Sequence, residues 1–372
     1  MRRRSLLKAV GLGMFATTAG AAKSGGETDG VYIQRKGTGD DPVGQNDIDE
    51  VVNIATDKYY RKHESGMETD GLYISKPVIE ENDLNLVGYG VYISPEGRAS
   101  VFVGSAPDSD VYNLNDVSST SENDDQVTAT EPMKPDMEDV VSNIHGQMEK
   151  FKKERNNGGG LTPQASSNDW GGFDVDRNLG DPVGETKNVV GDRCPTGKVE
   201  ETSKIYQHES KDNVFACASE LDVVPGDSNC ETKWKKELLK CWHQWQSGSF
   251  DTGEVKDTAP VEDNGGSSSY SMSASYSGGT PSVSIGATVT IPSTDITNFS
   301  NDDEGEWKYH FTSDDINGKG VYNVISFFEF NSSPTDGQQI VETETKARFD
   351  KFSNYGGRTF NDRSTIVYNP DK

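Results

Sequence analysis

The stretch S-K-I-Y-Q-H-E-S-K-D-N-V-F-A-C-A-S-E-L-D-V-V, residues 203–224, decides the fold class of this chain. Strand-like runs at Ser203–His208 and Val214–Val224 flank a polar turn at Glu209–Asp212, which predicts an antiparallel hairpin. Similar runs, separated by Gly, Asn, Asp and Pro, follow at 270–276, 282–291, 307–311, 321–330, 340–349 and 365–368. We therefore expect residues 169–372 to form an antiparallel, β-sandwich-like domain.

One helix is expected to interrupt these strands. Trp234, Leu238, Cys241 and Trp245 are separated by 4, 3 and 4 positions, so a helix over residues 231–246 would place them on one face. This face is expected to pack beneath the sheet.

The four cysteines, an even number in this one domain, favour two disulfides over a metal site, and no C-x-x-C pair occurs. In the expected helix, Cys230 and Cys241 would lie about 16 Å apart along the axis. That exceeds the limit of about 7 Å for a disulfide. Continuing the register of the 203–224 hairpin places Cys194 near Cys230. We therefore expect the pairs Cys194–Cys230 and Cys217–Cys241.

The first part of the chain predicts a small α+β domain at residues 27–105. The similar segments T-D-G-V-Y-I (28–33), T-D-G-L-Y-I (69–74) and G-V-Y-I (90–93) each predict a strand after a glycine turn. A D-x-x-E capping signal at Asp47 begins an amphipathic helix, and a further strand is expected near 98–104. Residues 106–168 are expected to be an acidic linker that holds a second amphipathic helix at about 135–155.

The N-terminus predicts export. Residues 1–21 combine a basic start, an uncharged stretch and alanines spaced for cleavage, as in a signal peptide. The run R-R-S-L-L-K, which contains Arg3 and Arg4, resembles the twin-arginine export signal. This resemblance implies that the twin-arginine export machinery is a partner and that the mature chain is secreted or extracellular. The apolar run is far shorter than the roughly 20 residues of a membrane-spanning helix.

The charge of the chain limits its partners. It has 61 acidic against 36 basic residues, for a net charge of −25. Such a chain repels phosphate, so we expect no nucleic-acid partner and no attraction to anionic lipid surfaces. Acidic surfaces remain hydrated where salt screens their repulsion. Together with the export signal, the composition resembles that of a secreted protein of a halophilic archaeon.

The segment 270–291 has an unusual pattern. Apolar residues alternate with Ser, Thr and Gly on both sides of the turn G-G-T-P at 278–281, and the segment carries no charge. The apolar residues include Tyr270, Met272, Tyr276, Val283, Ile285, Val289 and Ile291. In outline the segment resembles the stem hairpin of β-pore-forming toxins, whose strands need about 9–11 residues to cross a bilayer. The other interpretation is a sandwich hairpin with one buried face.

One acidic segment partly matches a calcium-binding loop. Asp174, Asp176, Asn178 and Glu185 occupy positions 1, 3, 5 and 12 of a D-x-D-x-N…E pattern. The required glycine at position 6 is replaced by Leu179, and no helical pattern flanks the loop. We expect no cofactor, with calcium at these four residues as the alternative to an acidic surface turn.

Taken together, these features predict a mainly β protein with a small α+β N-terminal module and a disulfide-stapled C-terminal domain. No G-x-S-x-G elbow, Walker loop or dinucleotide fingerprint occurs, so we do not expect an enzyme. The first functional hypothesis is non-catalytic binding of a cell-surface or extracellular ligand at high salt, which rests on analogy with other β-sandwiches. The alternative is a secreted membrane-active factor, pore-forming or antimicrobial, that uses the 270–291 hairpin and so meets a membrane.

Overall fold

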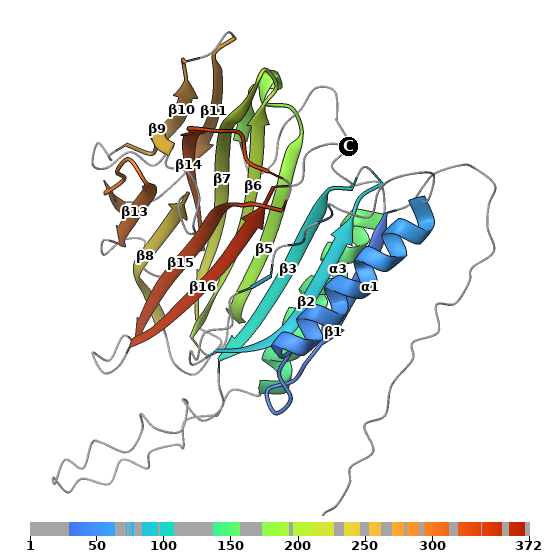
Figure 1. The fold of residues 1–372 in the computed structure, drawn as a ribbon. Helices are drawn as coiled ribbons and strands as arrows, with labels where there is room; N and C mark the ends of the chain where they lie inside the picture. Colours follow the sequence, from blue (N-terminus) through green and yellow to red (C-terminus); the bar gives the residue numbers. More distant parts are fainter. Residues whose placement is uncertain are drawn as a thin grey trace, which may run out of the picture.

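The computed structural model of this chain contains three β-sheets and two α-helices in the part that it describes (Figure 1). This part comprises residues 30–63, 72, 74, 76–77, 84–95, 97–107, 137–156, 173–192, 196–226, 234–245, 253–261, 270–278, 281–289, 294–311, 319–335, 337–351 and 357–368. The expected signal peptide, with Arg3 and Arg4, lies outside these residues.

The largest sheet has eight strands in the order β1-β2-β3-β5-β6-β7-β14-β9, and we call it the central sheet. Its strands are β1 (Val31–Lys36), β2 (Leu84–Ile93), β3 (Ala99–Pro107), β5 (Pro182–Asp192), β6 (Gly197–His208), β7 (Lys211–Pro225), β14 (Gly320–Phe330) and β9 (Gly253–Ala259). Neighbouring strands are antiparallel except β3 and β5, which are parallel. The expected hairpin at 203–224 is present as β6 and β7.

Two smaller sheets pack on the central sheet. The five-stranded sheet has the order β12 (Thr294–Asn298), β13 (Glu304–Phe311), β8 (Trp234–Gln244), β15 (Gln339–Lys351) and β16 (Gly357–Val367). The three-stranded sheet contains β10 (Tyr270–Tyr276), β11 (Val283–Val289) and β4 (Phe173–Val175), and the short 3-10 helix Arg177–Leu179 follows β4.

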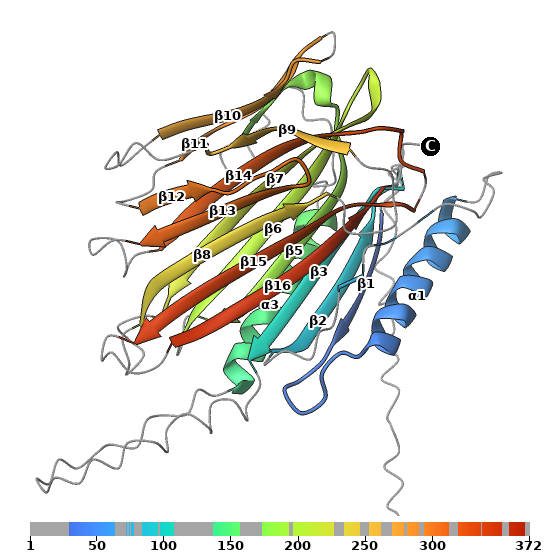
Figure 2. The ribbon, with the colours of Figure 1, turned by 60° about the vertical axis from the view of Figure 1, so that its left-hand side comes forward.

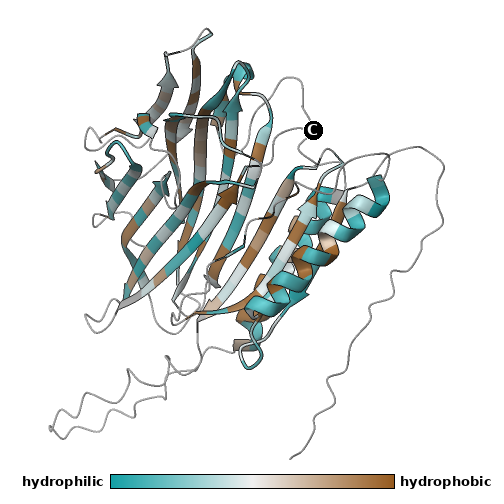
Figure 3. Cartoon of the chain, viewed as in Figure 1, coloured by the Kyte–Doolittle hydropathy of each residue, from teal (hydrophilic) through white to brown (hydrophobic). Residues whose placement is uncertain are grey.

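The two faces of the central sheet carry different layers. Helix α1 (Gln45–His63) and the five-stranded sheet cover one face, whereas helix α3 (Met137–Asn156) and the three-stranded sheet cover the other (Figure 2). Strand β7 shows the consequence, because residues 214–219 are buried on both sides. Apolar and polar residues alternate along many of these strands (Figure 3), as expected where the two faces of a strand differ in environment.

The mainly β prediction is confirmed, and the two helices expected before residue 168 are present. The apolar stripe of α1 packs on β1, β2 and β3, and Ile48, Ala55 and Tyr59 are among its buried residues. The stripe of α3 packs on the opposite face through Ile144, Met148 and other apolar residues. Most of the 69–74 segment lies outside the described residues. The pairing of β3 with β5 joins the first strands to the later ones in one sheet, so the sheet runs across the boundary expected at residue 105.

The predicted helix at 231–246 is wrong, because residues 234–244 form strand β8. A β-bulge explains the misleading spacing. The register between β15 and β8 shifts between Arg348 and Phe349, which leaves Glu237 as the extra residue. The extra residue changes which positions point inward, so that buried residues at alternate positions are interrupted once by a spacing of three. Trp234, Cys241 and Trp245 are therefore all buried, as the expected helical face required, whereas Leu238, its fourth member, is only partly buried.

The predicted disulfide between Cys217 and Cys241 is also wrong. Cys217 lies on β7 and Cys241 on β8, and both are free, buried thiols. The prediction assumed that Cys241 sat on a helix beside the 203–224 hairpin, whereas the two cysteines belong to strands of two different packed sheets. Cys194 and Cys230, the other predicted pair, lie outside the described residues.

Candidate functional site: the β10–β11 hairpin

The sequence-predicted hairpin at 270–291 forms β10 and β11, which pair from Tyr270 opposite Val289 to Tyr276 opposite Val283. The apolar row faces the central sheet, and β10 lies beside β9 and over β14 (Figures 1 and 2). The buried side chains of this row are Met272, Ala274, Tyr276, Val283, Ile285 and Ala287. They join the main core cluster with β7 and β14 residues such as Ala216 and Phe327.

The opposite face of the hairpin is polar and carries no charge. Its exposed side chains are Ser271, Ser273, Ser275, Ser284 and Thr288. One hydroxyl pair links the two strands, because Ser271 Oγ and Thr288 Oγ1 are 3.3 Å apart. The side chains of Tyr270 and Val289, and all of Ile291, lie outside the described part. The hairpin is therefore amphipathic, with one row in the core and a row of hydroxyls facing solvent.

A polar contact at the turn end of the hairpin holds it to the body, and we call this contact the latch. The hydroxyl of Tyr276 donates to Glu329 Oε1 at 2.9 Å and accepts from Lys211 Nζ at 2.6 Å. Lys211 also donates to the Gly278 carbonyl at 2.9 Å. Tyr276 comes from β10, Lys211 from β7 and Glu329 from β14, so the latch joins the hairpin to two central strands.

The charges of the latch stabilise one another. Burial raises the pKa of the Glu329 carboxyl, but the Tyr276 hydrogen bond and the charges of Lys211 and Lys256 outweigh it, so this pKa lies below its ordinary value. The Tyr276 hydrogen bond and Glu329 raise the pKa of the Lys211 ammonium. Glu329 and Lys211 are therefore both charged around neutral pH.

Further hydrogen bonds attach the hairpin. The backbone N–H of Ser275 donates to Asp257 Oδ2 on β9 at 2.7 Å. His208 Nε2 donates to the Pro281 carbonyl at 3.0 Å, while His208 Nδ1 accepts from the Ser210 amide. Side chains rather than ladder hydrogen bonds thus join β10 to the central sheet, and β11 forms its ladder with β10 and the three-residue strand β4.

The four residues of the predicted calcium loop do not converge. Asp174 is exposed on β4, and Asp176 caps the following 3-10 helix by accepting from the Asn178 amide at 2.9 Å. Glu185 is buried on β5 and forms an ion pair with Arg155 of α3. Within the described ranges, no group of three or more His, Cys, Asp and Glu side chains is placed to hold a metal ion.

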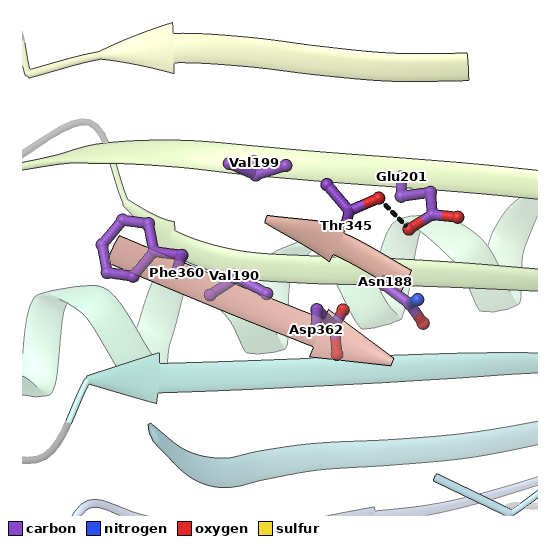
Figure 4. Close-up of a pocket in the computed structure, with 7 residues that line it drawn as sticks. All are labelled: Asn188, Val190, Val199, Glu201, Thr345, Phe360 and Asp362. Atoms are coloured by element: carbon purple, nitrogen blue, oxygen red, sulfur yellow. Dashed lines mark hydrogen bonds between the residues drawn. The ribbon is translucent and has the colours of Figure 1, made fainter. Parts of the chain in front are cut away.

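Sequence reasoning missed a polar cluster between the central and five-stranded sheets. Glu201 and Asp362 line a cavity of about 10 Å³, which has room for roughly one water molecule (Figure 4). The other lining residues are Asn188, Val190, Val199, Thr345 and Phe360. The sequence did contain a signal for this cluster. Val199, Glu201, Ser203 and Ile205 occupy alternate positions of β6, so the apolar Val199 and Ile205 indicate that Glu201 and Ser203 also point inward.

Sequence reasoning also missed the latch, for a different reason. Lys211 lies in the turn expected between two strands, and Glu329 lies near the end of an apolar run. The two charged residues meet only through Tyr276, which is 65 positions from Lys211 and 53 positions from Glu329 in the sequence. No local pattern therefore predicts the latch.

Comparisons with known proteins add little to this description. No protein-family model and no curated protein matches the sequence. One solved structure with a match is described as a pore forming protein; the match covers 53% of this chain and 93% of that chain at 8% identity, with a TM-score of 0.30. A TM-score of 0.30 is too low to establish a shared fold, so this likeness supports no functional conclusion.

Neither α-helix among the described residues is both long enough and apolar enough to cross a bilayer.

Proposed function

We propose that this chain is an exported, membrane-active protein whose β10–β11 hairpin leaves the central sheet and inserts into a lipid bilayer. The observation that carries the proposal is the separation of the hairpin into two uncharged rows. Its apolar row is buried on the body, and its exposed row contains only hydroxyls and glycine. In a bilayer the first row would face lipid and the second would face water.

The composition of the hairpin suits this transfer. Apolar side chains that leave the protein core would be buried again in lipid, which offsets part of the cost of exposing the central-sheet residues that they cover, such as Ala216 and Phe327. A charged side chain on the lipid-facing row would add about 2–4 kcal/mol at the bilayer centre. The chain as a whole has a net charge of −25, yet no residue from 264 to 294 is charged.

The sequence provides enough uncharged residues for a longer hairpin. The structure pairs seven residues on each strand, fewer than the roughly 9–11 needed to cross a bilayer. Residues 268–269 and 290–291 are also uncharged, so a hairpin that extends on insertion would have about nine residues in each strand, at the lower limit of that range.

Lipid also sets a condition on the number of chains. A lone hairpin would leave the backbone N–H and C=O groups of its outer edges without partners, and lipid supplies none. Several copies of the hairpin would therefore have to pair edge to edge in the membrane. In the structure the outer edge of β11 pairs with β4, and β10 lies beside β9.

The test is release of a dye trapped in phosphatidylcholine vesicles, in molar NaCl, by the chain without residues 1–21. Zwitterionic lipid avoids repulsion of the acidic surface, and salt screens what remains. We expect concentration-dependent release that rises more steeply than in proportion to protein. A chain that leaves the dye inside the vesicles at every concentration, while circular dichroism shows it folded, would refute the proposal.

A second function would use the hairpin without moving it. The hydroxyl row of Ser271, Ser273, Ser275, Ser284 and Thr288 is already exposed, and such a surface suits non-catalytic binding of an extracellular ligand. Replacing Ser273 with Asp separates the two functions. A charge there would disturb a docked ligand, but in a membrane it would face water, so dye release would be retained.

A further inference from the structure

A chain of hydrogen bonds runs between the central and five-stranded sheets, and we call it the polar seam. Ser203 Oγ donates to Glu201 Oε1 at 2.6 Å and lies 2.6 Å from Ser219 Oγ. Ser219 Oγ is 2.8 Å from His243 Nε2, and His243 Nδ1 is 2.8 Å from Ser326 Oγ. All five residues are at most 1% exposed. The seam therefore crosses from β6 and β7 to β8 and returns to β14.

The seam holds Glu201 in place from several sides. Thr345 on β15 donates to Glu201 Oε2 at 2.6 Å, while Ser203 holds Oε1. His243 is neutral, because burial lowers its pKa to about 3. A neutral imidazole donates through one nitrogen and accepts through the other, so it continues the chain without adding a charge. Glu201 cannot turn towards solvent without breaking these hydrogen bonds.

Asp362 faces Glu201 from the other sheet. It lies on β16, and its Oδ1 accepts from the Arg363 amide at 3.0 Å. Its Oδ2 is buried without a hydrogen-bond partner, as is Nδ2 of Asn188 in the same cavity. Burial, together with the charge of Glu201, raises the pKa of the Asp362 carboxyl to about 7. Burial also raises the pKa of Glu201, against the hydrogen bonds that lower it.

The other titratable groups near this pair do not neutralise it. Cys217 on β7 and Cys241 on β8 are thiols whose pKa burial raises well above the ordinary value, so they remain neutral. Arg363, next to Asp362, forms its ion pairs with Glu342 and Glu344. From β5 and β15 the cavity receives only the uncharged side chains Asn188, Val190 and Thr345.

We propose that Glu201 and Asp362, one from each sheet, form a proton-operated junction that holds β15 and β16 on the central sheet. With one proton on the pair, a single negative charge is buried and the seam satisfies it. When the proton leaves as the pH rises through neutrality, two buried carboxylates face each other across a cavity of water size. Their repulsion and the cost of desolvating both charges then open the packing between the sheets.

Hydrogen–deuterium exchange of the full chain between pH 6 and 9 tests the junction, in molar NaCl and corrected for the intrinsic pH dependence of amide exchange. We expect the protection of β15 and β16 amides to fall about tenfold between pH 6 and 8 and then to level off, because the folded junction loses its proton over that interval whereas the open state has already released it. The Asp362→Asn variant keeps this protection within about twofold. Asp295→Asn, at an exposed position on β12 of the same sheet, behaves like the wild type.

Two outcomes would overturn the proposal. One is constant protection of β15 and β16 in the wild type from pH 6 to 9. The other is the same loss in Asp362→Asn as in the wild type. If Asp362→Asn does not fold, the wild-type profile still decides, and Glu201→Gln serves as the second variant.

Discussion

The buried carboxyl of Asp362 predicts how the stability of the whole chain depends on pH. Its pKa rises from 3.8 to about 7 in the folded chain, mainly through burial and then through the charge of Glu201. The folded chain thus holds a proton that the unfolded chain releases. The sign follows directly: the contribution to stability is complete below about pH 4 and is lost as pH rises to about 7.

The magnitude follows from the two pKa values. Each unit of difference between the two pKa values corresponds to about 1.4 kcal/mol. Most of the range between these two pKa values lies between pH 5 and 7. The wild type should therefore lose about 3 kcal/mol of unfolding free energy through this group between pH 5 and 8.5. Asp362→Asn has no proton to lose at this site, so the loss should be absent from that variant.

Urea unfolding at pH 5 and 8.5, followed by tryptophan fluorescence, measures this difference. The same measurement on Asp295→Asn corrects for removing one negative charge from an acidic chain. The reasoning is refuted if wild type and Asp362→Asn change with pH by the same amount, within about 1 kcal/mol, because Asp362 would then titrate alike in the folded and unfolded chains.

Three further outcomes are expected. Cys217 and Cys241 should react with a thiol reagent only after unfolding, as counted by mass spectrometry, because both are buried and unbridged. Glu185→Gln should lower the unfolding free energy by about 3–5 kcal/mol in urea titrations, since it removes the carboxylate charge that pairs with the buried guanidinium of Arg155. Tyr276→Phe should speed both hydrogen exchange in β10–β11 and dye release, because it removes the hydroxyl at the centre of the latch.

Each of these outcomes has a control or a contrary result. A disulfide between Cys217 and Cys241 in the folded chain would contradict the prediction that both are free thiols. Glu304→Gln, at a more exposed position of β13, should change stability far less than Glu185→Gln. Tyr59→Phe removes a comparable hydrogen bond from α1 to the Pro95 carbonyl and should leave the hairpin and dye release unchanged. If it acts like Tyr276→Phe, the latch has no special role.

The sequence correctly predicted those elements in which the spacing of apolar residues is regular from end to end. The stripes of α1 and α3 and the alternation in β10 and β11 follow one period throughout, because each element packs a single face. Strand β8 was mistaken for a helix because the extra residue at Glu237 interrupts its alternation. Pairing of β3 with β5 was not foreseen, since these strands are far apart in sequence and no local pattern encodes their contact.

The site was predictable only in part. The uncharged, alternating pattern identified the hairpin, since it depends on neighbouring residues alone. The latch and the polar seam were not identified, because Lys211, Glu329 and Asp362 acquire their partners from strands distant in sequence. Polar residues at inward positions of a strand, such as Glu201, were the one available signal.

The central claim is that the hairpin must leave the body to act on membranes, and a reversible lock tests it most directly. Ser275 and Asp257 lie side by side on β10 and β9, where the Ser275 amide meets the Asp257 carboxylate at 2.7 Å. The double variant Asp257→Cys/Ser275→Cys, with its new disulfide confirmed by mass spectrometry, should release no dye when oxidised and recover wild-type release when reduced. Release by the oxidised, bridged protein at the wild-type rate would contradict the account.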